Sequence, residues 1–205
     1  MICLDIETQG LDPSRDSIVA IGVMDIWGLH VFSSSVEELK ISTENAEKRI
    51  LTEFSSYLGN CMPDDTFLTY NGLSFDFPFL AARARRHGNS FLERQLKEHS
   101  HLDIFPYCVS IVGRKISKYE ACSKLANLYS PRRTDGLWSS RLYSNIALLT
   151  VDAHCDMLAH NALDLSDTYK LYTVLKQFPD FTAWRMLALK NEATVAKAEM
   201  KAEVV

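Results

Sequence analysis

The sequence predicts an α/β protein in which three early strands form a meander and later helices cover a mixed sheet. Within residues 2–34, apolar segments rich in β-forming residues are separated only by short turns. Helical periodicity begins at Thr43, and one further strand, at residues 66–70, precedes a mostly helical remainder. A doubly wound parallel sheet would alternate strands and helices from its first strand onward, and this chain does not.

The predicted strands are short, and turn signals separate them. Residues 2–7 form the first strand, and residues 17–26 form a second that is apolar enough to be buried. The step Trp27-Gly28 favours a tight turn into a third strand at residues 29–34. Residues 66–70 are rich in types that favour strands.

The predicted helices show apolar residues at intervals of three and four. Pro78 falls in the first turn of one helix, where proline is tolerated, and Pro179 closes another. Residues 102–112 give no clear signal. The predicted helices are one that begins at Thr43 and four at residues 76–87, 117–128, 152–178 and 181–201.

A length of 205 residues fits one domain with a small accessory segment. We expect a domain at residues 1–178 and a C-terminal helical extension at residues 179–205, a candidate contact for a protein partner. No apolar run reaches the roughly 20 residues of a membrane helix, and the start MICLDIET is unlike a signal peptide. Five widely spread cysteines without a CxxC pair predict reduced thiols and a cytoplasmic protein.

The net charge of −4 is unusual for a nucleic-acid-binding protein, but the charge is unevenly distributed. Residues 1–82 carry 4 basic and 13 acidic side chains, whereas residues 83–141 carry 12 basic and 5 acidic ones. A solvated surface would explain the basic segment. A patch that follows phosphates beside an acidic, metal-binding centre would explain both segments.

Asp5 and Glu7 are the first candidate site residues. They lie two apart on the first predicted strand, so their side chains point to the same face. Two neighbouring carboxylates repel each other, and a cation between them removes that repulsion. Oxygen ligands favour Mg²⁺ or Mn²⁺. The alternative is a solvated strand end, because D-x-E is a common pattern.

Two further acidic positions lie at or within predicted helices. Asp76 opens the helix after the fourth strand, either as an ordinary N-cap or as a lone carboxylate in the apolar run FDFPFL that needs a partner. His160 and Asp164 are four residues apart and stack on one helix face. They form either a surface pair or part of a buried site, since the neighbouring residues are largely apolar.

Together these motifs resemble the DEDD (DnaQ-like) 3′→5′ exonucleases, which are RNase H-like nucleases that include proofreading subunits, RNase T and RNase D. The resemblance is carried, in chain order, by the D-x-E of the first strand, by N-x-x-x-F-D at residues 71–76 and by H-x-x-x-D at residues 160–164. It extends over about residues 1–175. Segments at residues 101–105 and 118–128 are similar to those of the YprB-type predicted exonucleases.

The resemblance implies an RNase H-like mixed five-stranded sheet flanked by helices. It also implies two divalent cations, Mg²⁺ or Mn²⁺, and hydrolysis of a strand from its 3′ end to nucleoside 5′-monophosphates. The implied ligands are Asp5, Glu7, Asp76 and Asp164, with His160 as the general base. In this chain the histidine lies four residues before the last aspartate, which is the spacing of the tyrosine-type enzymes; the histidine-type spacing is five.

By the same resemblance, Thr8, Leu11, Asn71 and Phe75 would contact a single-stranded DNA or RNA with a 3′ end. Three of them have a simpler alternative: Leu11 as a loop leucine that packs on the core, Phe75 as a core phenylalanine and Asn71 as the cap of a turn. Three other functions remain open: a nucleic-acid-binding module with little activity, a partner-binding subunit that uses the C-terminal helix, and a structure-selective endonuclease.

Overall fold

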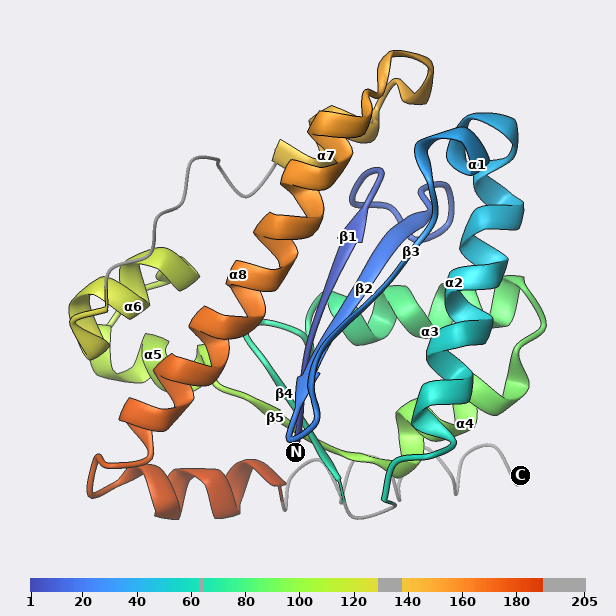
Figure 1. Cartoon of the computed structure of the whole chain (residues 1–205). Helices are drawn as coiled ribbons and strands as arrows, with labels where there is room; N and C mark the ends of the chain where they lie inside the picture. The colour runs from blue at the N-terminus through green and yellow to red at the C-terminus, as the bar shows by residue number, and fades with distance from the viewer. Residues whose placement is uncertain (63–64, 129–137, 190–205) are drawn as a thin grey trace.

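In the computed structural model, which describes residues 1–62, 65–128 and 138–189, five strands form one mixed sheet (Figure 1). The sheet order is β3-β2-β1-β4-β5, with β1 to β3 antiparallel and with β4 and β5 parallel to β1. The predicted meander and mixed sheet are therefore confirmed. The strands are β1 (Ile2–Thr8), β2 (Ile18–Asp25), β3 (Gly28–Ser33), β4 (Thr66–Thr69) and β5 (Ser100–Asp103).

Helices cover both faces of this sheet, with α8 crossing one face and α2 and α3 lying against the other (Figure 1). Residues 181–189 form a further helical segment, and the predicted helix beyond residue 189 lies outside the described residues. The helices are α1 (Val36–Ile41), α2 (Thr43–Leu58), α3 (Asp76–Arg86), α4 (Ser90–Glu98), α5 (Phe105–Val112), α6 (Lys118–Ala126), α7 (Trp138–Tyr143), the 3₁₀ helix η1 (Ile146–Leu148) and α8 (Val151–Leu175).

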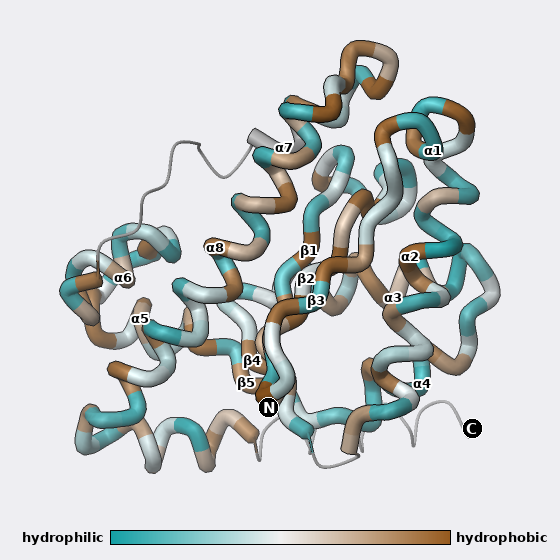
Figure 2. Tube along the Cα trace, viewed as in Figure 1, coloured by the Kyte–Doolittle hydropathy of each residue, from teal (hydrophilic) through white to brown (hydrophobic). Residues whose placement is uncertain are grey.

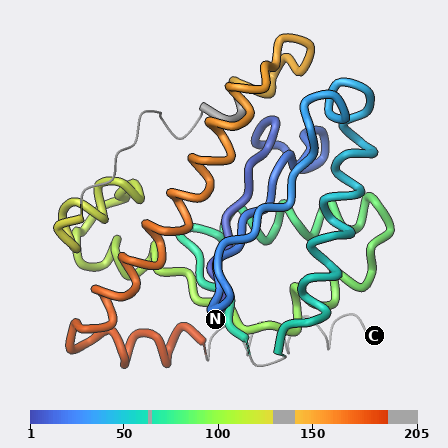
Figure 3. The backbone as a smooth tube through the Cα atoms, viewed as in Figure 1, coloured from blue at the N-terminus to red at the C-terminus, as the bar shows by residue number. Residues whose placement is uncertain are grey.

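Strand β1 divides its side chains between the two faces. Leu4 and Ile6 pack with α2 and α3, whereas Asp5 and Glu7 point to the opposite face. Hydrophobic residues gather along the central strands and alternate with hydrophilic ones along α8 (Figure 2). Helix α8 passes beside β1 in space (Figure 3), although 156 residues separate Asp5 from its contact Asn161.

Several short elements were not predicted. Strand β5 contains only four residues, of which three are polar, so no alternating pattern could identify it. Helices α1 and α4 are short and begin at the caps Ser35 and Asn89. All five cysteines are free thiols, and none of the helices in the described parts of the chain is long and apolar enough to cross a membrane.

Gly22 allows α8 to approach the sheet closely. It lies opposite Asp5 in the β1–β2 register, and a Cβ at this position would lie 1.8 Å from Asn161 Oδ1 and 2.8 Å from Leu165. We expect Gly22→Ala to lower the unfolding free energy by about 1–3 kcal/mol through overpacking. Chemical denaturation measures this change. Gly59→Ala is the control because its nearest contact would be 3.4 Å, and equal stability of the two variants would contradict the role of Gly22.

Candidate active site

Asp5 on β1 and Asp164 on α8 meet at one buried ammonium group. Lys118 Nζ donates to Asp5 Oδ1 at 2.8 Å and to Asp164 Oδ2 at 3.0 Å. Asp5 is half-buried, and Lys118 and Asp164 are buried. Strand β1 and helix α8 therefore bring together two carboxylates that are far apart in the sequence, and one cationic group neutralises both.

Lys118 was not predicted to be a site residue. It is the first residue of α6, whose N-cap Ser117 accepts a hydrogen bond from the Glu120 backbone N–H. The positive end of the α6 dipole therefore begins next to the two carboxylates. In the sequence, Lys118 is one of twelve basic residues in the middle segment, and it opens the segment that resembles the YprB-type exonucleases without being singled out there. The preceding Ser117 is typical of a helix N-cap, so it predicts where a helix starts but not a contact between Lys118 and the carboxylates.

Asp76 is the third carboxylate of the cluster. It is the first residue of α3, the N-cap is Phe75, and Asp76 Oδ1 accepts a hydrogen bond from the Ile6 backbone N–H at 3.0 Å. The N-cap interpretation is therefore wrong, since the carboxylate joins α3 to β1. Burial, together with the nearby charge of Asp5, raises the pKa of Asp76 to about 8, and Lys118 opposes this shift.

The shifted pKa predicts that the stability of the cation-free protein depends on pH. The folded pKa of Asp76 is about 8 against an ordinary value of 3.8, so folding takes up a proton between about pH 4 and pH 8. Unfolding free energy contributed by this group should fall, by a few kcal/mol at most, as the pH rises through that range. Burial also raises the pKa of Asp5, which adds in the same direction.

Urea unfolding in EDTA at pH 5 and pH 8 measures this dependence. Addition of Mg²⁺ or Mn²⁺ at pH 8 should restore stability, because a bound cation offsets the repulsion between the carboxylates. Asp76→Asn should show a shallower dependence on pH than the wild-type protein. An identical dependence in the two proteins would contradict the assignment of the shift to Asp76.

His160 and Asn161 place two further polar side chains beside the carboxylates. His160 Nε2 lies 4.0 Å from Asp164 Oδ1, one turn away on α8. Asn161 is fully buried and its Nδ2 donates to the Asp5 side chain at 3.0 Å and to the Asp5 carbonyl at 3.3 Å. The sequence motif did not identify Asn161, although its place three residues before Asp164 puts it on the same side of the helix.

Glu7 is buried on the same face of β1, one step closer to the end of the strand. It lies near Tyr143 of α7, since burial first and the charge of Glu7 second raise the pKa of the Tyr143 hydroxyl. That hydroxyl lies 2.6 Å from His154 Nδ1. Asp5 and Asp164 bind Lys118 directly, and the charge of Lys118 also acts on Asp76, whereas Glu7 lies on the adjoining side, toward α7.

Of the four residues predicted to contact nucleic acid, Thr8 ends β1 and the other three lie in the two loops next to these carboxylates. Thr8 is buried and its hydroxyl donates to the Gly10 carbonyl at 2.6 Å. Leu11 is 62% exposed, so it does not pack into the core as a simple loop leucine would. Asn71 has a left-handed φ of 71°, and the ring of Phe75 packs against that of Phe79, 5.5 Å between centroids.

The donor set suits a hard divalent cation, since carboxylate oxygens are the ligands that Mg²⁺ and Mn²⁺ prefer. Two of these carboxylates already share one cationic group, the ammonium of Lys118. Within the described residues, no three acidic, histidine or cysteine side chains are gathered tightly enough to enclose a metal ion in the present arrangement. The carboxylates therefore fit a divalent cation by their chemistry. In this structure the ammonium of Lys118 lies between two of them.

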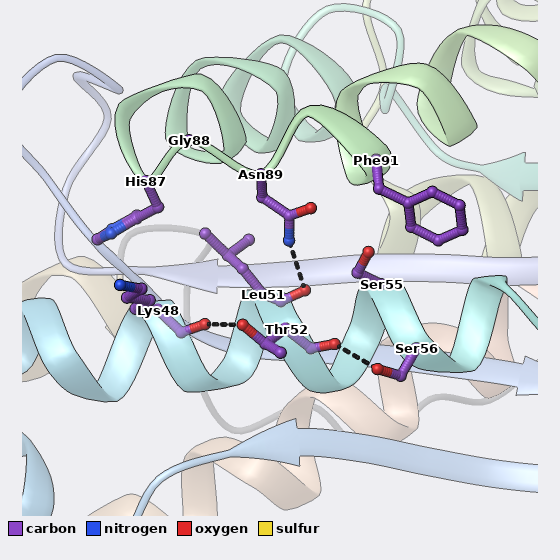
Figure 4. Close-up of a pocket in the computed structure, with 9 residues that line it drawn as sticks. All are labelled: Lys48, Leu51, Thr52, Ser55, Ser56, His87, Gly88, Asn89 and Phe91. Atoms are coloured by element: carbon purple, nitrogen blue, oxygen red, sulfur yellow. Dashed lines mark hydrogen bonds between the residues drawn. The ribbon is translucent and has the colours of Figure 1, made fainter.

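A cavity of about 310 Å³ lies away from these carboxylates, between α2 and the connection from α3 to α4 (Figure 4). Lys48, Thr52 and Ser56 line one wall, and His87 and Phe91 lie across from them. The hydroxyls of Thr52 and Ser56 donate to backbone carbonyls of their own helix. The predicted site residues take no part in this cavity.

The sheet order and the carboxylates on its central strand define an RNase H-like α/β protein. The chain belongs to the RNase_H superfamily, whose profile matches residues 2–176. A comparison with curated proteins found no match.

A solved structure with a similar fold is the family B DNA polymerase from the hyperthermophilic archaeon Pyrobaculum calidifontis. The two share 17% sequence identity with a TM-score of 0.65, over 85% of this chain and 24% of the polymerase chain. At that identity the likeness shows the fold alone, and this chain corresponds to about a quarter of that polymerase.

Proposed function

We propose that this protein is a metal-dependent 3′→5′ exonuclease that hydrolyses single-stranded nucleic acid to nucleoside 5′-monophosphates. The observation that carries the proposal is the convergence of Asp5, Asp76 and Asp164 around one cationic group. These carboxylates come from three separate elements, and Lys118 acts electrostatically on the first two and binds the first and the last directly. Buried carboxylates that lie this close together destabilise a fold unless a cation neutralises them. A cluster of this kind therefore favours a functional site over a purely structural one.

Asp5, Glu7, Asp76 and Asp164 would hold two divalent cations, which supply an acidified water and stabilisation of the leaving 3′ oxygen. His160 would take the proton of the attacking water at Nε2, the nitrogen that faces Asp164. Asn161 fixes the orientation of Asp5 through its side-chain amide.

The strand would enter over the two loops beside the carboxylates. Leu11 offers an exposed apolar side chain to the terminal base, and Phe75 offers a ring for stacking. Thr8 and Asn71 would contact the terminal nucleotide at the end of β1 and β4. The basic middle segment would guide the strand by contacts to phosphates that do not depend on sequence.

A nucleic-acid-binding module with little activity is the second candidate, and the position of Lys118 favours it. Its ammonium occupies the place between Asp5 and Asp164 where a cation would have to bind. If strand binding leaves this contact intact, the protein would hold nucleic acid without hydrolysing it.

A cleavage assay separates these functions. Single strands of DNA and RNA carry a 5′ label and a free or blocked 3′ end, and are incubated with Mg²⁺, Mn²⁺ or EDTA. The proposal predicts a ladder that shortens from the free 3′ end and is absent in EDTA. Cleavage that ignores the blocked end would indicate an endonuclease, and strands that are bound but intact would indicate the binding module.

A further inference from the structure

Asp103, at the end of β5, organises the loop that leads to Asp76. Its Oδ1 accepts hydrogen bonds from the backbone N–H groups of Asn71 at 2.7 Å and Phe105 at 3.0 Å, and its Oδ2 accepts one from Leu73 at 3.2 Å. Asp103 is buried, and burial raises its pKa despite these three bonds. The buried Asp103 carboxylate therefore binds two backbone N–H groups of one short loop, those of Asn71 and Leu73.

This loop, residues 70–75, is fixed at further points. Gly72 lies so close to β4 that a Cβ there would be 2.5 Å from the Thr69 side chain. The Tyr70 hydroxyl donates to the Ile116 carbonyl at 2.7 Å, two residues before Lys118. Asn71 adopts a left-handed φ of 71°, and its N–H donates to Asp103. The loop therefore joins β4 and β5 to the start of α6.

Asp76 has an anchor of its own, because its carboxylate is held by the Ile6 N–H. Loss of the Asp103 contacts would therefore loosen residues 71–73, while Phe75 stays packed against the core and Asp76 stays attached to β1. The side chains loosened would be those of Asn71 and Leu73, of which Leu73 is 40% exposed. Ser74, next to Leu73, is exposed as well, so this part of the loop is open to a strand.

We infer that Asp103 is a positioning residue that holds the 70–75 loop in the shape that receives the end of the nucleic-acid strand. The inference rests on the proposed nuclease function and assigns a residue that touches neither the strand nor the cations. Its expected signature is a rise in KM with little change in kcat, because the loop binds the strand and the carboxylates carry out hydrolysis.

Asp103→Asn tests this in the full chain. Asparagine keeps one acceptor oxygen but places an NH₂ where Oδ1 or Oδ2 now accepts a backbone N–H, so at least one of these hydrogen bonds is lost. Amide hydrogen exchange at Asn71 and Leu73 should accelerate about tenfold. KM for a single strand should rise about tenfold, with kcat changed by less than about threefold.

Asp25→Asn is the matched control. Asp25 Oδ1 also accepts two backbone N–H groups, those of Trp27 at 2.7 Å and Gly28 at 3.1 Å, in the turn between β2 and β3. This variant should leave both KM and the exchange of the 70–75 loop unchanged. Gly72→Ala is a second route to the same loop, since it moves the loop away from Thr69 without changing Asp103, and it should also raise KM.

Each outcome decides between the two proposals. A wild-type protein that cleaves no strand overturns the nuclease function and this inference with it. A wild-type protein that cleaves, together with KM within about twofold of wild type in both loop variants, overturns the role of Asp103 alone. Faster loop exchange with a raised KM in Asp103→Asn and not in Asp25→Asn supports it. If Asp103→Asn does not fold, Gly72→Ala alone decides by the same criteria.

Discussion

Asp76→Asn should lower the rate of strand cleavage by at least about 10³-fold. The asparagine can still accept the hydrogen bond from the Ile6 N–H, so the start of α3 should stay attached to β1. It removes one carboxylate charge from the proposed cation site, where cations stabilise the transition state by several kcal/mol. Initial rates on a labelled single strand with saturating Mn²⁺ measure the effect.

Asp156→Asn is the control, because Asp156 is an exposed aspartate on α8 outside the carboxylate cluster. It should cleave at the wild-type rate. A loss of less than about tenfold in Asp76→Asn, with normal folding, would show that this carboxylate is not a cation ligand.

His160→Ala should lower the cleavage rate by about 10²–10⁴-fold, the usual contribution of a general base. His160 Nε2 faces Asp164 Oδ1 at 4.0 Å, so the imidazole lies next to the proposed cation site. Single-turnover rates with excess protein measure the chemical step without a contribution from product release.

His30→Ala on the edge strand β3 is the matched histidine control and should retain activity. A loss of less than about threefold in His160→Ala would remove the role of general base. His160→Tyr tests the unusual spacing of the motif. Activity retained in that variant would show that the site accepts the geometry of the tyrosine-type enzymes.

The fold could be predicted where an apolar pattern continues over many residues or where glycine or proline indicates a turn or a helix end. The meander followed from the apolar runs of β1 and β2 and from Trp27-Gly28, and α8 followed from its length and its closing proline. Strand β5 was missed, because its residues are polar and its place in the sheet comes from parallel pairing with β4. Parallel pairing is a long-range contact and leaves little mark on a four-residue sequence.

The sequence predicted the acidic residues of the candidate site, but not the residues that contact them. D-x-E alternation correctly placed Asp5 and Glu7 on one face of β1, and helical spacing placed His160 next to Asp164. The contact of Lys118 with Asp5 joins residues 113 positions apart, so sequence spacing could not indicate it. For the same reason the attachment of Asp76 to β1, rather than to its own helix as a cap, emerged only from the structure.

Cation binding by the acidic cluster is the most direct test of the proposed chemistry. Titration of the full chain with Mn²⁺, with free Mn²⁺ followed by electron paramagnetic resonance, should show binding to the wild-type protein. Asp76→Asn and Asp164→Asn should each weaken that binding by at least about tenfold, and Asp156→Asn should not. Equal Mn²⁺ affinity in all four proteins would show that these carboxylates are not cation ligands and would contradict the proposed metal-dependent nuclease.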